Sequence, residues 1–430
     1  MTEQIVDIRH QAFRGSLEGQ TVNIPSMYKL LPEWRPNLHE EYERARDETL
    51  DPWIWRWVPN ERTARSLCAA DFGRFAAVWV PKSQSYRILC TAAKYFAWYF
   101  VYDDIFDCGS LKHDQHAAET YRQASLQYFE FTLLGKGSMP DLSEFDCELQ
   151  NALHCWDEVG EHIREVCSEE TCEVLCDEML RYVGSLNNVD SIFRDNELPS
   201  VQEYWDRRGA TAAVYCVIAT VPFIYGVDIH QSDIKISAMQ DLWKHASYFV
   251  HISNDMFSLR KELVDDQIEN LIPVLMLNDG IDCNTAMQRS YELLSNEAKG
   301  LQHAKERLLG APEAVSPEIS AAFIQGCFDT AMGLAHWSYC GARYFKTWER
   351  DDQDVIKFTI QGQPRQKDDT KPGERSQVVA CLASWYQSLP LRVVLIAPTI
   401  YSLVALLAKS TAFGWLPRGW IGHWKGSTPH

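Results

Sequence analysis

Three carboxylates stand where a long apolar stretch ends. Asp103, Asp104 and Asp107 follow the run 88–102, which is rich in aromatic and aliphatic residues. An anion in such surroundings is costly unless a cation or hydrogen bonds compensate its charge. On a helix Asp103 and Asp107 share one face, and Asp104 points about 100° away. Two hard oxygen ligands on one face suit a Mg²⁺ ion that also holds phosphates. A solvated acidic helix end is the competing interpretation, and this stretch alone leaves both open.

A second set of oxygen donors lies farther along the chain. Asn254, Ser258 and Glu262 follow one another at intervals of four, which places an amide, a hydroxyl and a carboxylate on one line along a helix. Such an oxygen-only set also suits Mg²⁺. The alternative is a polar stripe on an amphipathic helix. The residues just upstream are mostly apolar, namely Ala246, Tyr248, Phe249, Val250 and Ile252, and this favours a helix that is substantially buried.

Helices are the elements that would position these groups. Apolar residues recur at intervals of three and four from about residue 61 to residue 350, and alternating β-type runs are rare. The pattern predicts helices at 61–80, 84–107, 115–134, 144–163, 168–190, 200–224, 232–264, 282–308 and 316–349. We therefore predict an all-α single domain at 61–350, larger than a four-helix bundle. Residues 1–60 are broken by prolines, which predicts an arm with short helices.

The residues after the helical domain differ in composition. We predict a linker and C-terminal extension at 351–392 and an apolar tail at 393–430. The apolar run 393–408 is interrupted by Pro398 and falls short of the roughly 20 apolar residues of a spanning helix. Tryptophans follow it, as is typical of a membrane interface. Two alternatives stay open, namely membrane association through 393–424 and docking of the tail on the core.

The charge of the chain limits its partners. Its 430 residues carry a formal net charge of −18, so nucleic acid and anionic membrane surfaces are repelled. We expect no nucleic-acid partner. An anionic substrate would need metal ions and a local cluster of Arg and Lys to reverse this field. The N-terminal residues 1–20 are polar and lack the apolar centre of a secretory signal, so we expect a cytoplasmic protein, or one peripheral to a membrane through its tail.

The two donor sets, in this order and at this spacing within an all-α chain, resemble the metal motifs of class I terpene synthases. The sequence is most similar to fungal sesquiterpene synthases over about residues 25–350. The resemblance implies the class I terpenoid synthase fold, an α-helical bundle around a deep apolar pocket. It implies a lyase of isoprenoid secondary metabolism that cyclises farnesyl diphosphate to a sesquiterpene and releases diphosphate. It also implies three Mg²⁺ ions, two held by the aspartate-rich helix, mainly through Asp103, and one by the Asn254 set.

The same resemblance implies further site residues. The diphosphate would be bound by Arg208, Lys261, Arg343 and Tyr344, and the carbocation would face the aromatic rings of Phe100 and Trp337. Phe75, Phe96 and Tyr99 are weaker candidates for that second role. Ring faces stabilise cations by about 0.5–2 kcal/mol or more when water is excluded. The neighbouring Arg207 competes with Arg208, because the two cannot face the same way on a helix. Surface ion pairs, a helix terminus and core packing are the structural alternatives for these residues.

Three other functions share parts of this pattern. A cyclase of geranylgeranyl diphosphate would carry the same motifs and differ in pocket depth. A chain-elongating prenyltransferase would need a second aspartate-rich motif. Asp265 and Asp266, with Glu269, could be taken for one, but we interpret them as a helix end. The third alternative is a non-catalytic helical scaffold attached to membranes through its tail, and the intact motifs argue against it. Both a monomer and a homodimer fit the sequence.

Overall fold

The computed structural model describes residue 13 and residues 15–107, 109–186, 199–264, 269–311, 314–346 and 349–361. Contacts divide the chain into two units, Met1–Asp368 and Asp369–His430, and every described residue belongs to the first. The predicted apolar tail and most of the predicted linker at 351–392 therefore lie outside the described residues.

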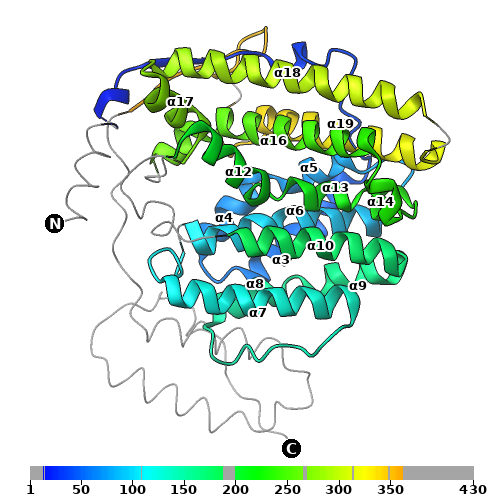
Figure 1. The fold of residues 1–430 in the computed structure, drawn as a ribbon. Helices are drawn as coiled ribbons and strands as arrows, with labels where there is room; N and C mark the ends of the chain where they lie inside the picture. Colours follow the sequence, from blue (N-terminus) through cyan, green and yellow to red (C-terminus); the bar gives the residue numbers. More distant parts are fainter. Residues whose placement is uncertain are drawn as a thin grey trace, which may run out of the picture. The chain divides into compact units, whose positions relative to one another are not determined.

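Helices dominate the described part of the first unit (Figure 1). The N-terminal elements are β1 (Thr21–Ile24), the 3-10 turn η1 (Met27–Lys29), α2 (Tyr42–Ala45), the π-helical turn η2 (Arg46–Leu50) and α3 (Asp51–Trp57). There follow α4 (Glu61–Ala70), α5 (Phe72–Trp79), α6 (Tyr86–Asp107), α7 (Gln115–Leu134), α8 (Cys147–His154), α9 (Asp157–Val166) and α10 (Glu169–Ser185). The last are α12 (Val201–Thr211), α13 (Val214–Ala219), α14 (Val221–Tyr225), α15 (Gln231–Ile234), α16 (Ser237–Val264), α17 (Leu271–Asp279), α18 (Cys283–Leu309), α19 (Pro317–Cys340) and β2 (Ile356–Thr359). The all-α prediction is confirmed.

The long helices form successive layers. In Figure 1 α18 lies along one side, where it packs on α16, and α16 packs in turn on α19. Helix α19 packs on α5, and α5 packs on α6. At the opposite side α7 packs on α10. The two helices that carry the predicted oxygen donors, α6 and α16, are therefore both interior, and rings such as Trp98 and Trp243 on these helices are fully or almost fully buried.

The N-terminal arm is fastened to α19. Strand β1 pairs antiparallel with β2, with Thr21 opposite Thr359. The Trp34 indole donates a hydrogen bond of 2.7 Å to Asp329, and the Met27 amide donates one of 3.0 Å to the Tyr339 hydroxyl. Burial raises the pKa of Asp329 to about 6, although Trp34 and two other donors act in the opposite direction. The arm is thus part of the core of this unit.

Several predicted helices are broken. The predicted helix 61–80 divides at Asp71, which has a left-handed φ of 57° and caps α5 by accepting a hydrogen bond from the Arg74 amide. The predicted helix 200–224 divides into α12, α13 and α14, with Ala213 at φ 56°. The predicted helix 144–163 divides into α8 and α9, and 316–349 ends early at Cys340. Helix α17 was not predicted. Its cap, Asn270, accepts a hydrogen bond from the Ile272 amide.

One apolar run in the described residues passes a length and composition test for a membrane span. This run, Val201–Tyr225, comprises α12, α13 and α14, and 56% of the tested window is buried inside the fold. It is divided at residues 212–213 and 220. Its burial and its breaks identify it as part of the core.

Candidate active site

A cavity of about 190 Å³ brings the two donor sets together. Its walls come from α5, α6, α10, α12, α13, α16 and α19 and from the segment that follows α19. The predicted site residues that line it are Phe100, Asp103, Arg208, Asn254, Ser258, Lys261, Glu262, Arg343 and Tyr344. Asp104 also lines it, although the helical angle alone directed Asp104 elsewhere. The side chain of Asp107 lies outside what the structure describes.

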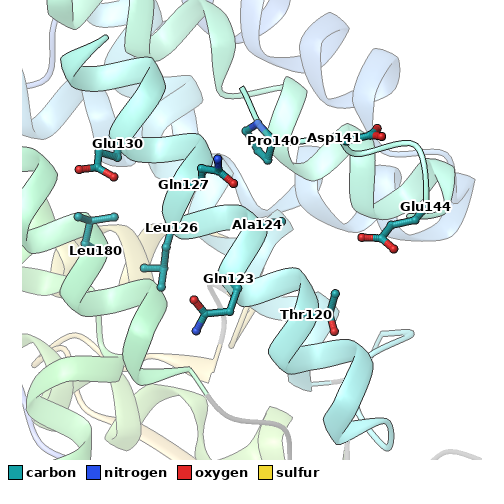
Figure 2. A pocket seen from close by; sticks show the side chains of 10 residues that line it. All are labelled: Thr120, Gln123, Ala124, Leu126, Gln127, Glu130, Pro140, Asp141, Glu144 and Leu180. Carbon is teal, nitrogen blue, oxygen red and sulfur yellow. The ribbon is translucent and has the colours of Figure 1, made fainter. Parts of the chain in front are cut away.

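A larger hollow, of about 720 Å³, is open to the surface. Figure 2 shows its lining, which comes from one side of α7, from the segment after α7 and from Leu180 of α10. Its polar members include Gln123, Gln127, Glu130 and Glu144. None of the predicted site residues lies there. The chemistry therefore belongs to the smaller, more enclosed cavity.

Arg208 links α12 to the second donor set. Its Nη2 donates hydrogen bonds of 3.0 Å to Asn254 Oδ1 and 2.9 Å to Asp255 Oδ1. Burial lowers the pKa of this guanidinium, but Asp255 together with Tyr204, Glu262 and Glu269 outweighs burial, and the pKa lies well above its usual value. Arg207 instead pairs with Glu269. Arg208 is therefore the arginine that faces the cavity. Of the competing aspartate-rich segment, Asp265 and Asp266 lie outside the described residues.

Asp255 is a buried anchor that the sequence reasoning did not assign. Its side chain is 1% exposed. Besides Arg208 it receives hydrogen bonds from the Tyr204 hydroxyl and, at 2.7 Å, from the Leu271 amide. The Asn270 amide group bridges the Asp255 carbonyl and Glu262 Oε2, both at 2.8 Å. These bonds tie α12, through Tyr204 and Arg208, and the start of α17 to α16. In the sequence, only the position of Asp255 next to Asn254 indicated that Asp255 belongs to the site.

The Asn254 set has the chemistry of a cation site. Burial, followed by the charge of Asp255, raises the pKa of Glu262 to about 7. Ser258 Oγ is buried and meets no hydrogen-bond partner of good geometry in the described residues. A divalent cation would satisfy both groups, since it takes oxygen ligands and favours an ionised carboxylate. Within the described residues no three His, Cys, Asp or Glu are grouped to hold a metal, so the mixed amide, hydroxyl and carboxylate set is the candidate.

The Glu262 pKa predicts how stability depends on pH without metal. A carboxyl whose folded pKa is about 7, against an ordinary 4.5, favours folding below pH 4.5, and this contribution is lost as pH rises through 7. We expect the metal-free protein to lose up to about 3 kcal/mol through this group between pH 4.5 and 8. Urea unfolding of wild type and Glu262→Gln across this range measures it. The variant should have the flatter profile, and identical profiles would contradict the assignment.

The opposite wall is formed by α6. The Tyr182 hydroxyl of α10 donates a hydrogen bond of 3.4 Å to Asp103 Oδ1. This phenol places the Asp103 carboxylate against α10, on the cavity wall that also includes Asp104. Two adjacent carboxylates thus face the same space that holds Asn254 and Glu262. An acidic helix end exposed to bulk solvent does not describe this geometry.

The segment after α19 closes the cavity. Tyr344 Oη accepts a hydrogen bond of 3.1 Å from Asn254 Nδ2, and the Arg343 guanidinium lies 4.4 Å from the centre of the Phe100 ring. Arg343 Nε is buried and has no hydrogen-bond partner among the residues that the structure describes, so it can donate to an incoming anion. Arg260 fixes this segment. It donates 2.6 Å to the Tyr344 carbonyl and pairs with Glu349 at 2.5 Å. Arg260 is a positioning residue that the sequence analysis missed.

Aromatic rings line the other end of the cavity, but they are not the complete predicted set. Phe75, Phe96, Tyr99 and Phe100 are among the lining residues, and Trp337 is not. Trp337 is fully buried and stacks behind the wall, with its ring centre 5.3 Å from that of Phe72. Its indole donates to the carbonyls of Ala70 and Asp71 at the break between α4 and α5. The placement differs from the expected pocket role because this hydrogen bonding directs the ring to the helix break.

Comparison with known proteins finds a family model and relatives for this chain. Residues 94–299 match the family described as terpene synthase family 2, C-terminal metal binding. The chain is 25% identical to sesquiterpene cyclase hepA of Aspergillus oryzae over 355 residues, which span 80% of this chain and 94% of that protein. It is 23% identical to silphinene synthase peniA of Penicillium patulum, over 79% of this chain and 90% of that protein. The similarity therefore extends over most of the length of both relatives.

Solved structures are similar in fold. A linalool/nerolidol synthase from Streptomyces clavuligerus, in complex with 2-fluorogeranyl diphosphate, superposes with a TM-score of 0.59 at 17% identity, over 72% of this chain and 98% of that one. An α-eudesmol synthase superposes with a TM-score of 0.59 at 18% identity, over 71% and 96% of the two chains. The helical layers described above are thus the class I terpene synthase fold.

Proposed function

Because this chain belongs to the terpene synthase family and is a terpene cyclase that acts on a prenyl diphosphate, we propose that its substrate is farnesyl diphosphate and its cofactor Mg²⁺. The observation that carries the proposal is one cavity with two unlike ends. Carboxylates, an amide, a hydroxyl and cationic side chains form one end, and aromatic rings form the other. A C15 substrate is supported by the sesquiterpene cyclase and silphinene synthase names of the relatives.

The polar end would hold the diphosphate. We assign its binding to Arg208, Lys261, Arg343 and Tyr344, and metal ligation to Asp103, Asp107, Asn254, Ser258 and Glu262. Three Mg²⁺ ions, when bound, would neutralise the charge that the leaving diphosphate develops. Arg208 now donates to Asn254 Oδ1, so this arginine must exchange that bond for a diphosphate oxygen as the amide becomes a ligand. Substrate binding and completion of the Asn254 site are thereby coupled.

The aromatic end would shelter the carbocation. The Tyr99 hydroxyl turns away to donate 2.5 Å to the Tyr95 hydroxyl, which donates 2.9 Å to the Cys216 carbonyl. Tyr99 therefore offers its ring to the cavity and keeps its oxygen satisfied elsewhere. With Phe96 and Phe100 it forms a surface that stabilises positive charge without supplying a nucleophile. Exclusion of water protects a cation from premature capture.

The test is incubation of the purified full-length protein with Mg²⁺ and, separately, geranyl, farnesyl and geranylgeranyl diphosphates. We expect a cyclic C15 hydrocarbon or alcohol by gas chromatography–mass spectrometry and stoichiometric release of diphosphate. The kcat/KM for the C15 substrate should exceed that for the C20 substrate at least tenfold, and EDTA should abolish turnover. A C20 product formed with the higher kcat/KM would overturn the farnesyl assignment. The absence of any terpene product would overturn the proposed activity.

A further inference from the structure

One histidine of the cavity wall has no role in the site described so far. His251 lies on α16 one turn before Asn254, it is 0% exposed, and it lines the cavity. Neither of its ring nitrogens meets a hydrogen-bond partner in the described part of the chain. A neutral imidazole carries one donor and one acceptor, and each buried polar group left unpaired costs about 1–3 kcal/mol. An unpaired imidazole that is kept at a cavity wall despite this free-energy cost is arranged for a partner that arrives with the substrate.

Two other histidines of the core region, the buried His162 and the partly buried His336, show that this is not its general state. His162 shares a hydrogen bond of 2.7 Å with the Thr91 hydroxyl, and His336 shares one of 2.8 Å with the Tyr28 hydroxyl. Neither lines the cavity. Among these three histidines, His251 alone has no hydrogen-bond partner in the described residues and also lines the cavity.

The surroundings of His251 keep a lone pair available. The rings of Trp205 and Tyr248 lie against it, with centres 5.5 Å and 4.8 Å from its own, and they hold its orientation. Burial, and then the positive charge of Arg208, lower the pKa of His251 well below its usual value. The ring is therefore neutral at pH 7, and one nitrogen keeps an unprotonated lone pair on the cavity wall, next to the apolar Val250 and one turn before Asn254.

We propose that His251 is the base that ends the reaction by taking a proton from the last carbocation. The proposal rests on the terpene cyclase function proposed above. The unprotonated ring nitrogen removes a proton from a carbon next to the cationic centre, and the electrons of that C–H bond form the C=C double bond of the product. The imidazole becomes an imidazolium. It returns to the neutral form when the proton passes to the departing diphosphate, so the overall reaction converts the prenyl diphosphate to a hydrocarbon and hydrogen diphosphate.

The test compares products as well as rate. In His251→Asn, a polar side chain remains but the basic nitrogen is lost. We expect the share of the main hydrocarbon among all products to fall at least tenfold, with alcohols or isomeric alkenes in its place. Diphosphate release should fall by a smaller factor, because ionisation precedes the proton transfer. His251→Phe, which also removes the hydrogen-bonding groups, should change the products in the same direction. Gas chromatography–mass spectrometry and a diphosphate assay on the same samples measure both quantities.

His336→Asn is the matched control, since it replaces a partly buried histidine outside the cavity and should keep the wild-type product ratio while lowering the melting temperature. Wild-type product ratios in both His251 variants would overturn the inference. The inference would also be overturned if diphosphate release fell as much as the main product did, because His251 would then act in the ionisation step. These outcomes differ from failure of the proposed function, in which wild type itself forms no terpene.

Discussion

Asp103→Asn should lower diphosphate release from farnesyl diphosphate about a thousandfold and leave the protein folded. Asparagine keeps the size of the side chain and one oxygen that can accept from Tyr182, so packing is preserved. The change removes the negative charge with which this wall would attract divalent cations, and loss of one preorganised electrostatic group costs about 10²–10³ or more in rate. A coupled diphosphate assay across a Mg²⁺ titration measures the effect, which should not be restored by raising the metal concentration tenfold.

An exposed carboxylate of the same type provides the control. Asp352 lies in a turn before β2 and is exposed, so Asp352→Asn should change neither turnover nor the melting temperature appreciably, as is usual for surface substitutions. Turnover of Asp103→Asn within threefold of wild type would remove this residue from the proposed metal site. Loss of the far-ultraviolet helical signal in that variant would instead assign Asp103 a structural role.

Arg208→Met should reduce both activity and stability. The activity loss, about 10²–10³ in kcat/KM, follows from removing a cation that would balance the developing diphosphate charge. The stability loss, about 3 kcal/mol, follows from leaving the buried Asp255 without its ion partner. The two effects can be separated. In the double variant Arg208→Met/Asp255→Asn the unpaired charge is also removed, so urea unfolding should show most of the stability restored while turnover stays low.

The neighbouring arginine is the matched control for that experiment. Arg207 lies on the same helix, pairs with Glu269 and does not line the cavity. Arg207→Met should therefore retain kcat/KM within a few-fold. Equal activity losses in the two single variants would show that α12 as a whole, rather than the Arg208 guanidinium, supports turnover. A double variant as unstable as Arg208→Met would contradict the ion-pair explanation.

The sequence predicted what depends on regular spacing. Helix α7 was predicted with its observed ends, because Asp114 caps it through the Ala117 amide and Gly135 ends it at φ 64°. The line from Asn254 to Glu262 was predicted for the same reason, since an uninterrupted helix fixes which side chains share a face. The placement of Asp103 and Asn254 at one cavity depended on the family resemblance, because spacing within each helix says nothing about how two helices pack.

The sequence could not predict features that arise where elements meet. Ala213 takes a left-handed φ of 56° between α12 and α13, a conformation that costs an alanine about 1–2 kcal/mol and that no glycine or proline announces. Packing must impose this conformation, and residues 211–214 around it line the cavity. Trp337 was assigned to the pocket on the family resemblance, and its carbonyl partners at Ala70 and Asp71 come from a helix break that the sequence did not predict. His251 stood out only when its surroundings were known.

The pairing of β1 with β2 has a consequence for synthesis of the protein on the ribosome. Thr21 and Thr359 face each other across 338 positions, and the docking sites of the arm on α19 are also made late. At about 5–20 residues per second, β1 waits roughly 17–70 s for its partner. During most of that interval Asp329 has not been synthesised, so Trp34 lacks its partner and apolar arm residues such as Leu31 stay exposed. The nascent chain should therefore bind chaperones through its arm. Release of the arm from the chaperones should be among the last events of folding.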